Sequence, residues 1–133
     1  MVRIIDTSLA IKWFAEEEGR EEALEILAEL LEAPQLFAVP ELFYFELLHV
    51  FYRLFSDASL EQKELLDAVL GFGMTRFSIT TDLANEVKKF ISMGLSGYDA
   101  AYVALARVTR GVWLTCDKKA HQKVAHLGLS QLV

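Results

Sequence analysis

Short runs of apolar residues alternate along the chain with longer stretches in which apolar residues recur at helical spacing. Several of the short runs are rich in branched or aromatic side chains and flanked by turn-forming residues, a pattern typical of buried strands. We predict strands at residues 2–5, 36–39, 77–80, 112–115 and 129–133. Strands that alternate with helices favour an α/β fold, in which helices cover a parallel sheet.

The longer stretches predict helices at residues 20–32, 41–55, 59–70, 82–93, 98–110 and 118–126, with a short helix after Thr7 and Ser8. Pro40 suits the opening of a helix, and Ser59 with Gln62 has the spacing of a capping box. Two of these helices are amphipathic. Their predicted inward residues are Ala23, Leu24, Leu27, Leu30 and Leu31 in one helix, and Leu83, Val87, Phe90 and Ile91 in the other.

The helix predicted at 41–55 is apolar on nearly all sides. At about 100° per residue, Glu46, His49 and Arg53 share one narrow polar stripe. This stripe faces either water or a polar cleft, and the helix alone does not decide between them. A carboxylate on so apolar a helix is costly unless it has a partner, and a metal ion would be one. Glu41 is a weaker candidate because acids at a helix start simply favour the helix dipole.

Length and composition indicate one globular domain, spanning residues 1–133, without a disulfide framework. The chain has 133 residues, and 53% of them are hydrophobic. Cys116 is the single cysteine, which excludes an intramolecular disulfide and a multi-cysteine zinc site. His121 and His126 are five residues apart and do not share a helix face as a zinc pair would. No targeting signal or membrane-length apolar run is present, so we expect a soluble, cytoplasmic protein.

The net charge of −6 is unevenly distributed. Residues 16–32 contain eight Glu and one Arg, whereas residues 100–133 contain five Lys or Arg and one Asp. Two ordinary solvated faces would explain this distribution. The basic C-terminal region nevertheless permits a polyanionic partner, without demanding one.

Acidic residues occupy unusual positions in the predicted fold. Asp6 and Asp117 each follow an apolar strand, and ligands of open parallel sheets bind outside the carboxyl ends of the strands. Asp99 lies in the first turn of a helix rich in alanine, which can pack closely on its neighbours. Simpler explanations also exist, because Asp is a favoured N-cap and acids stabilise the first turn of a helix.

A cluster of Asp6, Glu46, Asp99 and Asp117 would have a definite chemical use. Crowded carboxylates repel one another and force a proton onto one of them unless a cation is present. Mg²⁺ prefers oxygen ligands, often a few carboxylates with water and substrate phosphate. One or two such ions can activate water for attack on phosphorus. Acidic ligands without His or Cys therefore favour phosphodiester chemistry with Mg²⁺ or Mn²⁺.

Four segments of the chain resemble PIN-domain ribonucleases, and most closely the compact VapC-type toxins of toxin–antitoxin pairs. They are residues 4–8, Val39 and Pro40 with Glu46, residues 98–106, and residues 114–117, in the family order. The resemblance implies a three-layer α/β/α domain with a five-stranded parallel sheet in the order 3-2-1-4-5. It also implies a Mg²⁺- or Mn²⁺-dependent endoribonuclease, an inhibitory antitoxin and a homodimer. Ser8 and Thr115 match family hydroxyls that support the acidic site.

Two functional hypotheses remain open. In the first, the four acids hold metal, and basic side chains contact the RNA phosphates: Arg53, Lys12, Lys118, Lys119 and Lys123. Solvated surface residues are the simpler interpretation of each base. In the second, the same scaffold binds RNA or protein without cleavage, and the aromatic surplus of residues 43–55 marks an interface. A phosphatase or a phosphorelay receiver fits poorly, since Ser8 stands where a phosphatase needs a second Asp.

Overall fold

The computed structural model describes residues 1–55 and 59–133, and the side chains of residues 59–61 lie outside the description. Five parallel strands form one sheet in the order β3-β2-β1-β4-β5, which confirms the predicted fold class and strand order. The strands are β1 (Arg3–Ile5), β2 (Phe37–Pro40), β3 (Thr75–Phe77), β4 (Val112–Thr115) and β5 (Ser130–Leu132). Because β1 lies centrally, its carboxyl end is flanked by those of β2 and β4.

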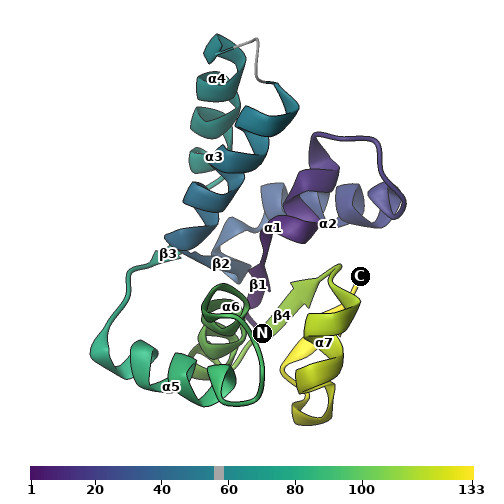
Figure 1. The fold of residues 1–133 in the computed structure, drawn as a ribbon. Helices are drawn as coiled ribbons and strands as arrows, with labels where there is room; N and C mark the ends of the chain where they lie inside the picture. Colours follow the sequence, from purple (N-terminus) through teal and green to yellow (C-terminus); the bar gives the residue numbers. More distant parts are fainter. Residues whose placement is uncertain (56–58) are drawn as a thin grey trace.

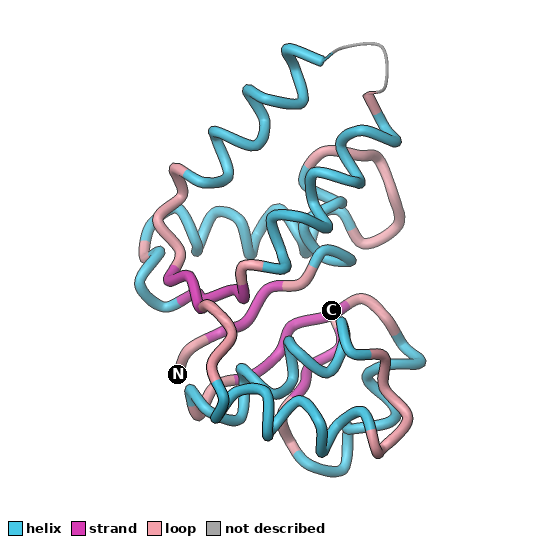
Figure 2. Tube along the Cα trace, turned by 60° about the vertical axis from the view of Figure 1, so that its left-hand side comes forward, coloured by secondary structure: helices cyan, strands magenta, loops and turns pink. Residues whose placement is uncertain are grey.

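Helices cover both faces of this sheet (Figures 1 and 2). Crossovers between parallel strands are right-handed. Helices in the connections from β1 out to β3 therefore cover one face of the sheet, and helices in the connections from β3 back to β5 cover the other face. The chain runs from β1 to β3 through α1 (Thr7–Ala10), η1 (Ile11–Trp13), α2 (Arg20–Glu32), η2 (Pro34–Leu36), α3 (Leu42–Leu54) and α4 (Ser59–Leu70). It returns through α5 (Thr81–Ile91), α6 (Gly97–Thr109), α7 (Lys118–Val124) and η3 (Ala125–Leu127). None of the described helices is long and apolar enough to cross a membrane.

Helix α6 packs directly on the central strands β1, β2 and β4. Its buried face includes Ala100, Ala104 and Ala106, whose small side chains allow this close approach. Gly111, just beyond the helix, allows another: a Cβ there would lie 2.2 Å from the carbonyl oxygen of Val2. The start of α6 is therefore held against the carboxyl edge of the sheet, where β1 and β4 end.

The third strand differs from the sequence prediction, because β3 covers residues 75–77 and not 77–80. The Phe77 carbonyl accepts a hydrogen bond of 2.9 Å from Glu41 N–H, and the strand ends there. Thr80 instead caps α5, since its hydroxyl accepts a hydrogen bond of 3.1 Å from Leu83 N–H. Pro40 likewise belongs to β2, where it pairs with Phe77, and does not open the following helix.

Three residues predicted to point inward are exposed, namely Leu24, Leu31 and Ile91. The buried residues of α2 are Ala23 and Leu30, which shows that only a narrow face of this helix is covered. The predicted capping box of Ser59 and Gln62 lies partly outside the described side chains. The Gln62 amide donates a hydrogen bond of 2.8 Å to the Phe55 carbonyl.

Candidate functional site

The four predicted acids come from both faces of the sheet and from two neighbouring strands. Asp6 directly follows β1 and Asp117 follows β4, and these strands pair with Ile5 opposite Leu114. Glu46 comes from α3 on one face, and Asp99 comes from the first turn of α6 on the other. All four therefore belong to segments that approach the carboxyl edge of β1 and β4.

Asp6 is almost completely buried, with 4% of its surface exposed. One carboxylate oxygen accepts hydrogen bonds from the Ser8 hydroxyl at 2.6 Å and from Leu9 N–H at 3.1 Å, so Asp6 caps α1. The other oxygen accepts from the Trp113 indole N–H at 2.9 Å. Burial raises the pKa of Asp6 to about 6, although these donors and the Thr115 hydroxyl oppose the shift.

Hydroxyl groups connect the ends of β1 and β4. The Ser8 hydroxyl lies 3.2 Å from the Thr115 hydroxyl and accepts a hydrogen bond of 2.9 Å from Cys116 N–H. The Thr115 hydroxyl in turn accepts one of 3.1 Å from Asp117 N–H. Together with the Ser8 bond to Asp6, these contacts fix the backbone of both strand ends around the buried carboxylate.

Asp117 and Asp99 form a pair of like charges. Asp117 is exposed and caps α7, since one carboxylate oxygen accepts a hydrogen bond of 3.1 Å from Ala120 N–H. Asp99 is partly buried, and burial together with the nearby Asp117 charge raises its pKa. Lys123 opposes this shift, while its ammonium group donates a hydrogen bond of 2.8 Å to the Gly94 carbonyl. Negative charge is therefore concentrated between the first turns of α6 and α7.

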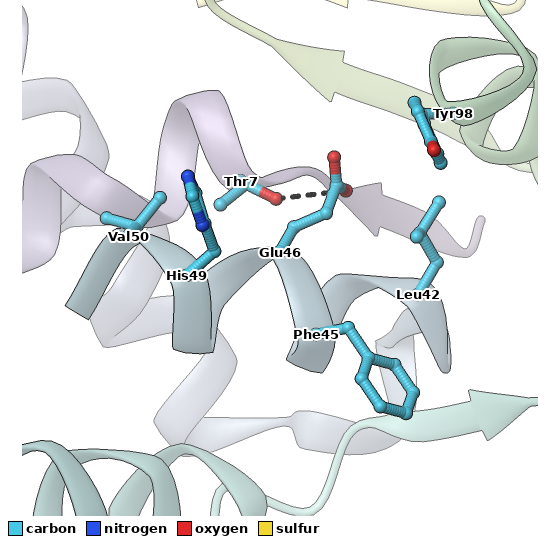
Figure 3. A pocket seen from close by; sticks show the side chains of 7 residues that line it. All are labelled: Thr7, Leu42, Phe45, Glu46, His49, Val50 and Tyr98. Atoms are coloured by element: carbon cyan, nitrogen blue, oxygen red, sulfur yellow. Dashed lines mark hydrogen bonds between the residues drawn. The ribbon is translucent and has the colours of Figure 1, made fainter. Parts of the chain in front are cut away.

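Glu46 points toward the strand ends and not into bulk water (Figure 3). One of its oxygens accepts hydrogen bonds from the Thr7 hydroxyl at 3.2 Å and from the Tyr102 hydroxyl. Burial and the nearby Glu46 raise the pKa of Tyr102, so its hydroxyl stays protonated and donates. Glu46 thus faces a polar cleft, whereas His49 and Arg53 on the same stripe are exposed, so each of the two alternatives holds for part of the stripe.

Glu41, the weaker acidic candidate, is engaged elsewhere. The Arg76 guanidinium donates two hydrogen bonds to its carboxylate, one of them 2.8 Å long. This partner lowers the pKa of Glu41. Because the pair is fork-like and local, Glu41 has a structural role at the edge of β3.

The basic candidates come from separate elements of the fold. Lys12 and Lys118 line one hollow of about 420 Å³ together with Cys116, which adjoins Asp117. Within this hollow the Lys12 ammonium donates to the Glu18 carbonyl. Arg53 is exposed on α3, two turns beyond Glu46, and Lys119 is exposed on α7. Lys118 and Lys119 are thus the cations that follow the end of β4 most closely along the chain.

The chemistry of the acidic side chains fits a hard divalent cation. Asp99 and Asp117 repel each other, and a cation between them would relieve that repulsion. Within residues 1–55 and 59–133, no three His, Cys, Asp or Glu side chains already meet as a metal-binding group. Trp113 donates a hydrogen bond to Asp6, and Tyr102 donates one to Glu46. These bonds hold both carboxylates toward protein groups, which explains in part why the acids do not meet. Shared coordination by all four acids is therefore a proposal.

Three contributors to the site were not predicted: Thr7, Tyr102 and Trp113. Two of them could have been found from spacing. Tyr102 is three residues beyond Asp99 on the same helix, and Trp113 alternates with Thr115 on one face of β4. Thr7 could have been found only through the packing of α1 against α3.

Comparisons with known proteins agree with this architecture. A toxin–antitoxin complex from Klebsiella pneumoniae contains a chain with a similar fold, at 18% identity and a TM-score of 0.72, covering 97% of this chain and 95% of that one. A crystal structure of a protein from Pyrobaculum aerophilum matches at 18% identity and a TM-score of 0.67, covering 92% and 79%. At such identities these likenesses establish the fold alone.

No curated protein sequence matches the chain. The model of the PIN domain family matches residues 3–127, which include all four acids and nearly the whole chain. The chain therefore belongs to the PIN domain family.

Proposed function

We propose that this chain is a metal-dependent endoribonuclease that hydrolyses RNA phosphodiester bonds, as the toxin of a type II toxin–antitoxin pair. The observation that carries the proposal is the like-charge pair Asp99–Asp117 at the carboxyl edge of the sheet, where the buried Asp6 follows β1. PIN domains are generally nucleases, and one structural neighbour comes from a toxin–antitoxin complex. Both comparisons support the proposal, and residues 1–133 would act as one nuclease domain.

The residues that would hold Mg²⁺ or Mn²⁺ are Asp6, Glu46, Asp99 and Asp117. Held there, such an ion would supply activation of water for in-line attack on phosphorus and stabilisation of the leaving oxygen. Ser8 and Thr115 hold the two strand ends, and through them the backbone of Asp6 and Asp117, in fixed positions. Tyr102 and Thr7 both bind the same oxygen of Glu46 and so fix the direction of its carboxylate.

Three basic side chains are proposed to contact the phosphates of the RNA. Lys12 and Lys118 are proposed phosphate contacts because they line one hollow next to Cys116 and Asp117. Arg53 is a further proposed contact, on the same stripe of α3 as Glu46. Single-stranded or looped RNA is the favoured substrate, because a small site can reach its phosphates more easily than those of a duplex.

A cognate antitoxin and a second copy of the chain are the proposed protein partners, in the cytoplasm. Phe45 and Leu48 on α3 support this part of the proposal, with 73% and 41% of their surfaces exposed. Exposed apolar surface of this kind often marks an interface. The alternative function, a non-catalytic module that binds RNA or protein, is supported by the same exposed side chains.

A cleavage assay tests the proposed function. Purified chain is incubated with single-stranded RNA in Mg²⁺, in Mn²⁺ and in EDTA, and cleavage is expected only with metal. Asp117→Asn and Asp6→Asn should abolish cleavage while the fold, followed by circular dichroism, persists. Asp82→Asn is the matched control, because Asp82 is an exposed acid in the first turn of α5.

Two results would reject the assignment: cleavage that survives EDTA, or full cleavage by the pure Asp117→Asn variant. Mn²⁺ binding, measured by calorimetry, separates the enzyme from the alternative module. An absence of both Mn²⁺ binding and cleavage would favour the module.

A further inference from the structure

A hollow of about 590 Å³ opens beside Glu46 and shares no lining residue with the hollow of Lys12 and Lys118. Polar groups in its lining come from Thr7, Glu46 and His49, and apolar surface comes from Leu42, Phe45 and Tyr98. Its volume lies in the range of small-molecule sites. Thr7 directly follows Asp6, so the hollow adjoins the acidic site already described.

Tyr98 forms one wall of this hollow. Figure 3 shows Tyr98 and His49 on opposite sides of the Glu46 carboxylate, with Leu42 beneath Tyr98. The Tyr98 side chain is 64% exposed, although the residue immediately precedes Asp99 in the first turn of α6. An aromatic ring is therefore presented to solvent in the same hollow as Glu46, one of the proposed metal-binding acids.

The charge of the hollow indicates which part of a nucleic acid it can accept. Its lining contains a carboxylate and no Lys or Arg, so it offers no countercharge to a phosphate. Lys12 and Lys118 line the other hollow instead, together with Glu18 and Glu22. A flat, uncharged group with hydrogen-bonding edges suits the combination of Tyr98, Leu42 and the polar groups of His49 and Thr7. A nucleobase has these properties.

We infer that this hollow binds one unpaired nucleobase of the RNA, stacked on Tyr98, next to the phosphate that is cleaved. This inference rests on the proposed function, to which it adds a binding position for one base of the RNA. The strand then runs from the base at Tyr98, past the acids, to the lysines beside Cys116. Stacking of this kind tolerates any base but requires that the base leave its duplex, so the site selects single-stranded RNA.

Cleavage of a short single-stranded RNA that lacks one base at a time tests the inference. With wild-type protein in Mg²⁺, loss of the base at one position should lower kcat/KM by roughly 10-fold, the size typical of one stacked base. Tyr98→Leu should lower kcat/KM of the intact RNA by a similar factor. Removal of the critical base should then cause no further loss in that variant. Tyr52→Leu is the matched control, because Tyr52 is 65% exposed on α3 and does not line the hollow.

The inference is overturned if Tyr98→Leu cleaves the intact RNA at the wild-type rate. It is also overturned if Tyr98→Leu slows intact and abasic RNAs by equal factors, or if Tyr52→Leu has the same effect. A second measurement is independent of cleavage: RNA that carries 2-aminopurine is titrated with protein in EDTA. Quenching lost in Tyr98→Leu supports base stacking even if no RNA is cleaved, which would reject only the proposed function. Absence of quenching with wild-type protein would reject the stacking site.

Discussion

The rings of Tyr102 and Trp113 lie nearly parallel, with centroids 6.4 Å apart and an interplanar angle of 11°. Each ring donates a hydrogen bond to a different acid of the site. The Tyr102 hydroxyl donates to Glu46, and the Trp113 indole N–H donates to Asp6 at 2.9 Å. One buried aromatic stack thus links the acid on α3 to the acid that follows β1.

This stack is suited to holding the acids because both rings are almost completely buried and have few rotatable bonds. Their donors replace water that the two carboxylates would otherwise bind, and hydrogen bonds to charged groups contribute about 1.5–3 kcal/mol each. The aromatic pair therefore acts as a positioning element for the proposed metal site.

Tyr102→Phe tests this role at Glu46. The variant keeps the ring on Trp113 and loses the hydroxyl that donates to Glu46 and approaches Thr7. We expect a loss of stability of about 1.5–3 kcal/mol, together with weaker Mn²⁺ binding and a lower kcat, since the Glu46 carboxylate keeps only the Thr7 donor that orients it. Calorimetric titration with Mn²⁺ and cleavage kinetics measure the two effects. Tyr52→Phe is the control, and an unchanged Mn²⁺ affinity in Tyr102→Phe would contradict the role.

Trp113→Phe tests the other end of the stack. The smaller ring leaves Asp6 without the indole donor and opens space in the core. We expect a loss of about 2–4 kcal/mol in unfolding free energy at pH 7, from the lost hydrogen bond and the cavity together. The loss should shrink at pH 5, where the Asp6 carboxyl of the variant is largely protonated. Urea unfolding at both pH values measures it, and equal losses at both would show that only packing is affected.

The order of the elements and the location of the acids could be predicted because they depend on local sequence. An apolar run that ends in Asp6 or Asp117 places each acid at the carboxyl end of a strand, whatever the surrounding packing. The close approach of α6 could also be predicted from its alanines. Asp6 and Asp117 also cap helices, as the simpler explanation of their positions predicted. An acid can therefore cap a helix and still lie at the edge of the sheet.

The partners of these acids could not be predicted, because they depend on how distant segments pack. Tyr102 reaches Glu46 across 56 residues, and Trp113 reaches Asp6 across 107. The end of β3 was misplaced for a related reason: its last paired residue is Phe77, opposite Pro40 of β2, and this register between distant segments is not visible near Phe77 in the sequence. Leu24 and Leu31 were misplaced because helical spacing does not reveal how little of α2 is covered.

Metal-free protein should lose stability as the pH rises through the pKa of Asp6. The folded-state pKa of about 6 lies above the ordinary value of 3.8, so the protonated carboxyl is favoured by folding. The associated stability is fully present below pH 3.8 and is lost as the pH passes 6. The shift corresponds to about 3 kcal/mol. Asp6→Asn should remove this part of the pH dependence.

Urea unfolding in EDTA between pH 4 and 8 measures this effect. The difference in unfolding free energy between wild type and Asp6→Asn is the relevant quantity, because other groups titrate in both proteins. A difference that stays constant across the range would show that burial does not raise the pKa of Asp6.

Asp117→Asn should affect the metal-free and metal-loaded protein in opposite directions. Asn is as good an N-cap as Asp, so α7 keeps its cap, and removal of one like charge relieves Asp99. Metal-free stability should therefore be unchanged or slightly higher. Wild-type protein should gain about 2.7 kcal/mol when Mn²⁺ is present at 100 times its dissociation constant, and the variant should gain much less. Thermal unfolding with and without Mn²⁺ measures both, with Asp82→Asn as the control. A variant that is stabilised by Mn²⁺ as strongly as wild type would place the cation away from Asp117, and the acids at the sheet edge would then need another explanation.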